Sequence, residues 1–133
     1  MLRSKRILLV DDDQLNNLIN SRIITKFTDF TVESFTSGKD GLKYLSTCDP
    51  ESFPEVIFLD INMPVMDGWE FLEEYEKIHE TLQPKCNVIM LTSSIDFTDI
   101  EKSRKYKTVK EFMSKPLTLE SLKVVASMSS LSA

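Results

Sequence analysis

Three runs of consecutive apolar residues, each ended by a polar residue, restrict the folds open to this chain more than any other feature. The runs are Ile7–Val10 before Asp11, Val56–Leu59 before Asp60, and Val88–Leu91 before Thr92. A short apolar run without alternation is typical of a strand that is buried on both faces. Strands of that kind belong to parallel sheets with helices on each side, so the runs predict an α/β fold.

Segments with helical character separate these runs, and two weaker strands complete the pattern. The weaker strands are Thr31–Phe35 and a strand around Phe112–Met113 that ends at Ser114. The first expected helix is capped by Asp13 and has Leu15, Leu18, Ile19, Ile23 and Phe27 at helical spacing. The next two are Gly38–Leu45, which follows Ser37, and Gly68–Glu80, which follows Asp67. The last two are a charged helix from Asp96 or Thr98 to about Lys107 and a helix capped by Thr118 that runs through Ala126. Strand and helix alternate five times, which predicts a doubly wound, five-stranded parallel sheet with helices on both faces.

Size and composition fit one domain that needs no covalent support. The 133 residues predict a single domain, with a core at about residues 5–126 and a flexible tail at 127–133. Hydrophobic residues make up 41% of the chain, which suffices for a core without a disulfide or a structural metal. The three glycines are too few for the glycine-rich loops that bind nucleotide phosphates. The net charge of −5 lacks the basic character that nucleic-acid binding requires.

The N-terminal segment has neither the length of a secretion signal nor that of a membrane anchor. Arg3, Lys5 and Arg6 precede only four apolar residues before the chain turns acidic. The two cysteines, Cys48 and Cys86, fit no zinc-binding spacing. These features predict a protein of the reducing cytoplasm that does not bind membranes.

Polar residues follow four of the five predicted strands. They are Asp11 and Asp12, Asp60, Thr92 and Lys115. Parallel strands bring them to the carboxyl edge of the sheet, where ligands bind in open α/β folds. Three crowded carboxylates repel one another, and a hard divalent cation such as Mg²⁺ relieves that repulsion. With an ammonium and a hydroxyl beside them, the carboxylates suit the transfer of a phosphoryl group.

At these residues the sequence resembles the receiver domain of two-component response regulators, the family that includes the chemotaxis protein CheY. The matching stretches are Ile7–Asp12, Asp60–Gly68 with the sequence DINMPVMDG, Met90–Ser93, and Ser114–Thr118. The resemblance covers about residues 5–126. It implies a flavodoxin- and CheY-like sheet with the strand order 2-1-3-4-5.

The resemblance also implies a phosphoacceptor and a metal site. Asp60 would accept a phosphoryl group from a phosphohistidine on a sensor histidine kinase or a histidine phosphotransfer protein. Asp12 and Asp60 would bind Mg²⁺ through their carboxylates, Asn62 through its backbone carbonyl, and Asp11 through water. The chain would catalyse only its own phosphorylation and dephosphorylation, and would otherwise not be an enzyme.

Further residues would stabilise the phosphoryl group and transmit the signal. Lys115 would pair with Asp60 and then with a phosphoryl oxygen, and the Lys115–Pro116 peptide bond would be cis. Thr92 would bind another phosphoryl oxygen on activation. Phe112 stands at the aromatic switch position, where tyrosine is frequent in the family.

The function expected from this resemblance is that of a stand-alone receiver that switches protein–protein contacts. Its output surface would carry Lys102, Lys105 and Lys110, which favours an acidic downstream protein or a phosphorylation-dependent homodimer. Whether the chain is a terminal output or a shuttle in a phosphorelay stays open at this point.

Two other functions deserve comparison. Asp11-x-Asp13 after an apolar strand also resembles the nucleophile motif of Mg²⁺-dependent phosphatases of the haloacid-dehalogenase type, but only Thr-Ser-Ser follows the fourth strand, where those enzymes carry an acidic pair. A flavodoxin-like FMN site needs a hydroxyl-rich loop after the first strand, and Asp11-Asp12-Asp13 opposes a phosphate there.

Overall fold

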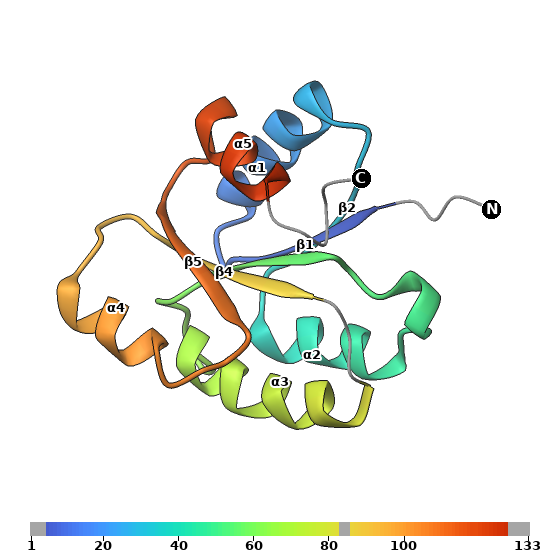
Figure 1. Cartoon of the computed structure of the whole chain (residues 1–133), viewed down its shortest axis with the longest axis vertical. Coiled ribbons are helices and arrows are strands. Elements are labelled where there is room, and N and C mark those ends of the chain that lie inside the picture. The colour runs from blue at the N-terminus through green and yellow to red at the C-terminus, as the bar shows by residue number, and fades with distance from the viewer. Residues whose placement is uncertain (1–4, 83–85, 128–133) are drawn as a thin grey trace.

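The structure is a computed structural model that describes residues 5–82 and 86–127. It contains one sheet of five parallel strands in the order β2-β1-β3-β4-β5 (Figure 1), which confirms the predicted fold and topology. The strands are β1 (Arg6–Val10), β2 (Thr31–Phe35), β3 (Val56–Asp60), β4 (Asn87–Thr92) and β5 (Val109–Ser114). The helices are α1 (Gln14–Phe27), α2 (Gly38–Thr47), α3 (Gly68–Leu82), α4 (Phe97–Ser103) and α5 (Leu119–Ala126), and a short 3-10 helix, η1, spans Pro50–Ser52.

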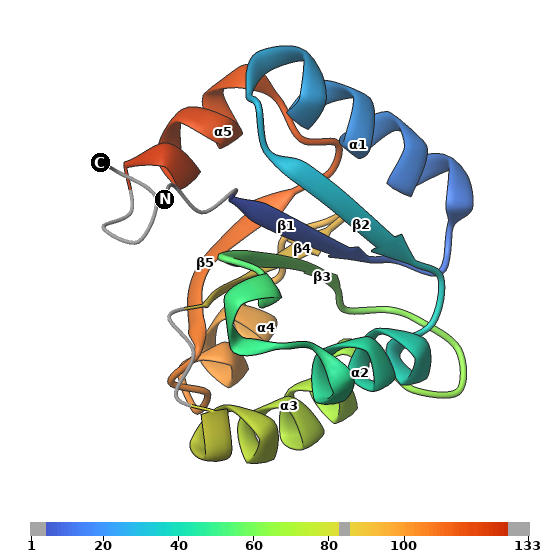
Figure 2. The ribbon, with the colours of Figure 1, turned by 90° about the vertical axis from the view of Figure 1, so that its right-hand side faces the viewer.

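The three central strands are buried on both faces, as their apolar runs predict. Because successive side chains of a strand point to opposite sides, each strand feeds two separate cores. Ile7 and Leu9 pack with Ile24 of α1 and with α5, whereas Leu8 and Val10 pack with α2 and α3. Figures 1 and 2 show α1 and α5 on one face of the sheet and α2, α3 and α4 on the other.

Side-chain caps set the starts of the helices, and the predicted caps are confirmed. The carboxylate of Asp13 accepts hydrogen bonds from the first turn of α1, and the hydroxyl of Ser37 does so for α2. Asp67 and Glu70 form a reciprocal pair at the start of α3, and Thr118 caps α5. Each cap satisfies backbone N–H groups that the helix itself leaves without partners.

Helix α1 buries a different face from the one that its apolar spacing marks. Leu15 is 61% exposed and Leu18 is 48% exposed, and Ile19 and Phe27 are exposed as well. The buried residues of α1 are Asn17, Asn20 and Ile24. The apolar spacing therefore predicted the helix correctly but not the side that meets the sheet.

The segment between β4 and β5 also departs from the prediction. Helix α4 ends at Ser103 rather than near Lys107, and β5 begins at Val109, three residues before the predicted strand. Tyr106 stacks on Trp69 of α3 with 5.9 Å between ring centroids, and its hydroxyl donates to Glu73 at 2.8 Å. These contacts with α3 fix the turn, and they join residues too far apart in sequence for a local pattern to reveal.

Smaller differences concern the ends of elements. Helices α2 and α3 each continue two residues beyond the predicted ends. Of the predicted tail at 127–133, only Ser127 belongs to the described residues. Among the helices in the parts of the chain that the structure describes, none combines the length and the apolar character needed to cross a bilayer.

Candidate functional site

Strand register brings the predicted site residues to one edge of the sheet. Val10 of β1 pairs with Leu59 of β3, so Asp11 and Asp60 leave the two strands at the same level. Asp60 in turn pairs with Leu91 of β4, directly before Thr92. Thr92 pairs with Ser114 of β5, directly before Lys115. Residues from four segments of the sequence therefore meet in space, as the sequence predicts.

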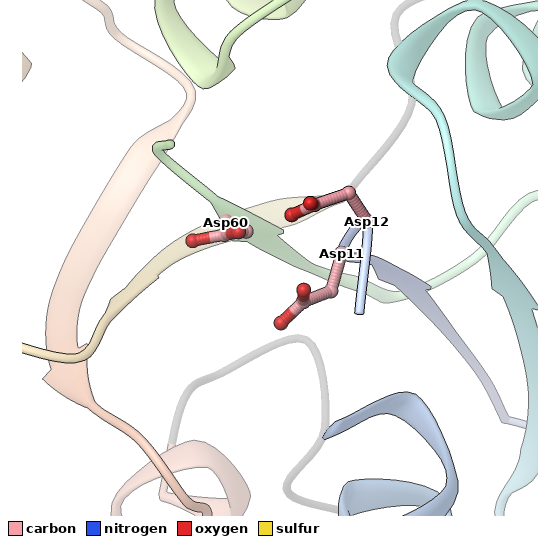
Figure 3. A group of neighbouring side chains, drawn as sticks. All are labelled: Asp11, Asp12 and Asp60. Atoms are coloured by element: carbon pink, nitrogen blue, oxygen red, sulfur yellow. The ribbon is translucent and has the colours of Figure 1, made fainter. Parts of the chain in front are cut away.

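Asp11, Asp12 and Asp60 form an acidic cluster. One carboxylate oxygen from each lies within 4.8 Å of the other two. Figure 3 shows Asp11 and Asp12 at the end of β1 beside Asp60 at the end of β3. Asp11 and Asp60 are buried, whereas Asp12 is exposed. The cluster thus consists of two buried acids and one acid that faces solvent.

Lys115 connects two of these acids. Its Nζ atom lies 2.8 Å from Oδ2 of Asp11 and 3.1 Å from Oδ1 of Asp60. The backbone N–H of Lys115 donates to the carbonyl of Thr92 at 2.8 Å, which extends the β4–β5 ladder to the lysine. The Lys115–Pro116 peptide bond is cis. The ammonium therefore lies between the ends of β1 and β3, where it offsets part of their negative charge.

The electrostatics of the cluster disfavour charge on Asp60. Burial and the nearby Asp11 carboxylate raise the pKa of Asp60 from 3.8 to about 6, although Lys115 opposes this increase. For Lys115, burial acts to lower the pKa, but the contacts with Asp11 and Asp60 outweigh it and raise the pKa above 10.5. A carboxyl group with a raised pKa in a cluster of acids marks a place where a cation would be stabilised.

The ligand chemistry fits Mg²⁺. All three acids offer oxygen, which is the donor that Mg²⁺ prefers, and Mg²⁺ usually keeps several of its waters. Oδ1 of Asp11 already accepts the backbone N–H of Asp13 at 2.9 Å, and Oδ2 faces Lys115. Asp12 is exposed and stands at the mouth of the cluster. The residues present therefore suit a cation that is bound partly through carboxylates and partly through water.

Thr92 and Phe112 lie at the β4–β5 side of the site. The buried hydroxyl of Thr92 donates to the carbonyl of Ser94 at 3.0 Å and accepts from its N–H at 3.3 Å. Phe112 is half-buried and lines an open groove of about 410 Å³ between β5 and α5. In this structure, the Thr92 hydroxyl is thus engaged with its own loop.

A comparison with known protein families identifies this arrangement. The sequence model of the response regulator receiver domain matches residues 7–127. The chain belongs to the response regulator receiver domain family. Receiver domains are phosphoacceptors in two-component signalling rather than classical enzymes, they generally depend on Mg²⁺, and they interact with histidine kinases and phosphotransfer proteins.

Two solved structures are similar to this chain, one in sequence and fold and the other in fold. The receiver is similar to a two-component response regulator from Cytophaga hutchinsonii, with 31% identity, a TM-score of 0.82, and coverage of 93% of this chain and 95% of that chain. It shares its fold with the chemotaxis protein CheY4 of Vibrio cholerae, at 24% identity, a TM-score of 0.75, and coverage of 92% and 95% of the two chains.

A longer relative matches over its receiver portion. The curated protein named "Probable C4-dicarboxylate response regulator DctR" of Halalkalibacterium halodurans is 29% identical over 119 residues. The match covers 89% of this chain but only 48% of that regulator. The receiver therefore spans about half the length of this relative.

The loop of the receiver between Asp60 and α3 is held in place because the backbone at Gly68 packs closely against the backbone at Asp60 and Ile61. A Cβ atom on Gly68 would lie 2.7 Å from the carbonyl oxygen of Asp60 and 2.9 Å from Cα of Ile61, which a backbone cannot easily accommodate. The N–H of Gly68 donates to the carbonyl of Ile61 at 2.8 Å. Glycine thus allows α3 to begin directly against the end of β3. Within this loop, Val65 adopts a φ of 68° with its side chain 99% exposed.

Sequence reasoning missed two residues of the receiver that contact its site loops. Asn17 and Asn20 are buried on the inner face of α1. Asn17 donates to the carbonyl of Asp11, and Asn20 accepts from the N–H of Leu117, two residues beyond Lys115. A pair of asparagines three positions apart, in the helix that follows the acidic pair, was the available signal.

Proposed function

We propose that Asp60 accepts a phosphoryl group from a phosphohistidine on a histidine kinase or a phosphotransfer protein, in a reaction that depends on Mg²⁺. The observation that carries this proposal is the ammonium of Lys115, which lies 2.8 Å and 3.1 Å from two buried acids of a three-carboxylate cluster. Such an arrangement provides a nucleophile, a cation site and a positive charge for the transferred group.

In the proposed reaction, a carboxylate oxygen of Asp60 attacks the phosphorus of the donor. The P–O bond to Asp60 forms as the P–N bond to the donor imidazole breaks, and the imidazole leaves with the electron pair. Asp12, Asp60 and the backbone carbonyl of Asn62 would bind Mg²⁺, which supplies neutralisation of the charge on the phosphoryl oxygens. Asp11 would hold the cation through water, since both of its oxygens already have partners.

After transfer, Lys115 and Thr92 would bind separate phosphoryl oxygens. Lys115 already lies beside Asp60, so its ammonium needs little movement. Thr92 would exchange its hydrogen bond with Ser94 for one with the phosphoryl group, because a single hydroxyl proton cannot serve both acceptors.

The movement of Thr92 would open space for Phe112 to turn inward. Full burial of a phenylalanine contributes about 1.5–3 kcal/mol, and Phe112 is now only half-buried. The change would alter the groove between β5 and α5 and the face formed with α4. Of the predicted lysines, Lys102 is exposed but lies over the Trp69 ring of α3 with 5.0 Å from its Nζ to the ring centroid, whereas Lys105 and Lys110 are exposed without such a contact. These two lysines support an acidic protein or a second copy of the domain as the partner, although Glu111 and Glu120 line the groove itself.

The phosphoryl donor would dock next to the acidic cluster on α1. This helix begins two residues after Asp12, and its exposed apolar side chains include Leu15, Leu18 and Ile19. Exposed apolar side chains that gather on one helix face are a common property of protein–protein contacts. Their place at the mouth of the site supports a protein, rather than a small molecule, as the donor.

The acceptor is tested with acetyl phosphate and Mg²⁺, followed by intact-mass spectrometry. The wild type should gain one phosphoryl group, and the Asp60→Asn variant, which keeps the shape of the side chain but removes the nucleophile, should gain none. Phosphorylation of this variant to the wild-type level would move the nucleophile to Asp11 and refute the proposal.

The switch is tested by hydrogen exchange with and without beryllofluoride, which imitates the phosphoryl group. Exchange should change in residues 96–126, including the segment around Phe112. A response confined to the loops at Asp60 and Thr92 would contradict the proposed transmission to this face.

A further inference from the structure

The inner face of α1 carries two buried amides. Asn17 is 4% exposed and Asn20 is 2% exposed. An amide buried without partners destabilises a fold, so each buried asparagine needs hydrogen bonds that justify it. Both asparagines obtain these bonds from loops that carry the functional site.

Asn17 contacts the loop on the acidic side of the site. Its Nδ2 atom donates to the carbonyl of Asp11 at 3.0 Å and to the carbonyl of Phe35 at 3.2 Å. The carbonyl of Phe35 also accepts the N–H of Asp11 at 3.1 Å. Asn17 therefore ties the backbone of Asp11, at the end of β1, to the end of β2.

Asn20 contacts the loop on the lysine side. Its Oδ1 atom accepts the N–H of Leu117 at 3.0 Å in a buried hydrogen bond that joins residues 97 positions apart. Lys115 is held on its other side, because its N–H donates to the carbonyl of Thr92. The backbone that carries Lys115 is thus fixed to β4 before the lysine and to α1 after it.

We propose that Asn17 and Asn20 are positioning residues that hold the two halves of the site separately, Asn17 the metal-binding half and Asn20 the lysine half. This inference rests on the proposed function, in which Lys115 and the acids act on one phosphoryl group. The hydrogen bonds of both amides go to backbone groups and not to a carboxylate of the cluster, so each asparagine acts through the backbone of a loop.

The physical argument depends on the length of the lysine side chain. A long, flexible side chain reaches two acids at once only if its backbone starts from a fixed point. Without an acceptor at position 20, the N–H of Leu117 would lose its partner in a buried place, and the loop would move to recover one. The Lys115 ammonium would then leave its place between Asp11 and Asp60.

The two halves of the site predict that one variant changes the phosphorylation rate and the other changes the Mg²⁺ affinity. Asn20→Leu should leave the Mg²⁺ dissociation constant within about twofold of wild type, and should slow phosphorylation by acetyl phosphate about tenfold or more, since small misplacements of a catalytic group have large effects on rate. Asn17→Leu should weaken Mg²⁺ binding about tenfold, the size of effect typical of residues that orient metal ligands.

Two further variants separate positioning from a general loss of stability. Asn20→Asp keeps an oxygen acceptor at the same place and should restore most of the phosphorylation rate. Ile24→Ala, on the same buried face of α1, removes apolar packing from the cluster that includes Leu117 but no hydrogen bond to the site loops, and should change neither Mg²⁺ affinity nor rate by more than about twofold. Hydrogen exchange at the Leu117 amide should accelerate in Asn20→Leu and not in Asn20→Asp.

The outcomes distinguish this inference from the proposed function. If the wild type is not phosphorylated on Asp60, the proposed function fails and the inference fails with it. If the wild type is phosphorylated and Asn20→Leu reacts at the same rate, only the inference fails. It also fails if Ile24→Ala slows the reaction as much as Asn20→Leu, or if both asparagine variants change affinity and rate together.

Discussion

Replacement of Asp60 by asparagine should stabilise the metal-free protein at neutral and alkaline pH. Burial and the neighbouring Asp11 raise the pKa of Asp60 from 3.8 to about 6, so its charge is disfavoured in the folded state. One pKa unit corresponds to about 1.4 kcal/mol, so the ionised group costs folding at most about 3 kcal/mol above the raised pKa, and screening by solvent at the open side of the cluster reduces this cost. Asparagine has a similar shape and carries no charge, so Asp60→Asn should recover most of this free energy.

The stabilisation should disappear in acid. Below about pH 3.8, Asp60 is protonated in both the folded and the unfolded chain, and the variant gains nothing. Between 3.8 and about 6, the folded chain holds a proton that the unfolded chain has released, so the stability of the wild type falls as the pH rises. Above about 6, the full difference between wild type and variant should be present.

Urea denaturation in the presence of a chelator, followed by the fluorescence of the buried Trp69, measures this difference between about pH 4 and pH 8. Asp29→Asn, which changes an exposed aspartate outside the site, is the matched control and should have little effect at any pH. Addition of Mg²⁺ should stabilise the wild type more than Asp60→Asn, because the variant lacks one ligand. An Asp60→Asn variant that is no more stable than wild type at about pH 8, or a gain that does not depend on pH, would refute the assignment of Asp60 as an electrostatically disfavoured acid.

Three other substitutions test single features of the site. Asp12→Ala should weaken Mg²⁺ binding severely in calorimetry, because Asp60 would be the one proposed direct carboxylate ligand left for a cation that gives up its water reluctantly. Equal affinity in the two proteins would reject Asp12 as a ligand. Val65→Gly should stabilise the protein by about 0.5–1 kcal/mol in urea denaturation, since a left-handed backbone costs a non-glycine residue about 1–2 kcal/mol and the higher chain entropy of glycine offsets part of this; destabilisation would contradict the strain. Gly68→Ala should destabilise the protein by about 1–3 kcal/mol, because the new methyl group meets the backbone at Asp60; an unchanged denaturation midpoint would show that the loop moves freely.

The fold was accessible from the sequence because its strongest signals are local. The apolar runs of β1, β3 and β4 are continuous, and the caps Asp13, Ser37 and Thr118 stand directly before their helices. The orientation of α1 was not accessible in this way. A stripe of apolar residues indicates a helix, but it does not determine which side of the helix is buried. In α1 the buried side carries Asn20, whose side chain accepts a hydrogen bond from a backbone N–H 97 residues away.

The site, too, has features that the sequence predicted and features that depend on distant packing. Asp11, Asp60, Thr92 and Lys115 each follow a predicted strand, and this position sufficed to predict that they meet, because parallel strands share one direction. The contact between Lys115 and Asp11, which is shorter than the one with Asp60, depends on how the loop after β5 packs against α1. The engagement of the Thr92 hydroxyl with Ser94 likewise depends on a turn whose shape no sequence motif specified.

If phosphorylation switches the β4–β5 side as proposed, the magnitudes there require a contribution from the target. Phe112 is already half-buried, so its inward turn contributes less than the full 1.5–3 kcal/mol of a buried phenylalanine. A change from 1% to 99% occupancy of the altered state needs about 5.5 kcal/mol. In the proposed switch, the bond between Thr92 and the phosphoryl group would supply part of the remainder, and binding of a target to the altered face would supply the rest. Because binding energies are coupled reciprocally, a target that prefers the altered face would also favour phosphorylation of Asp60.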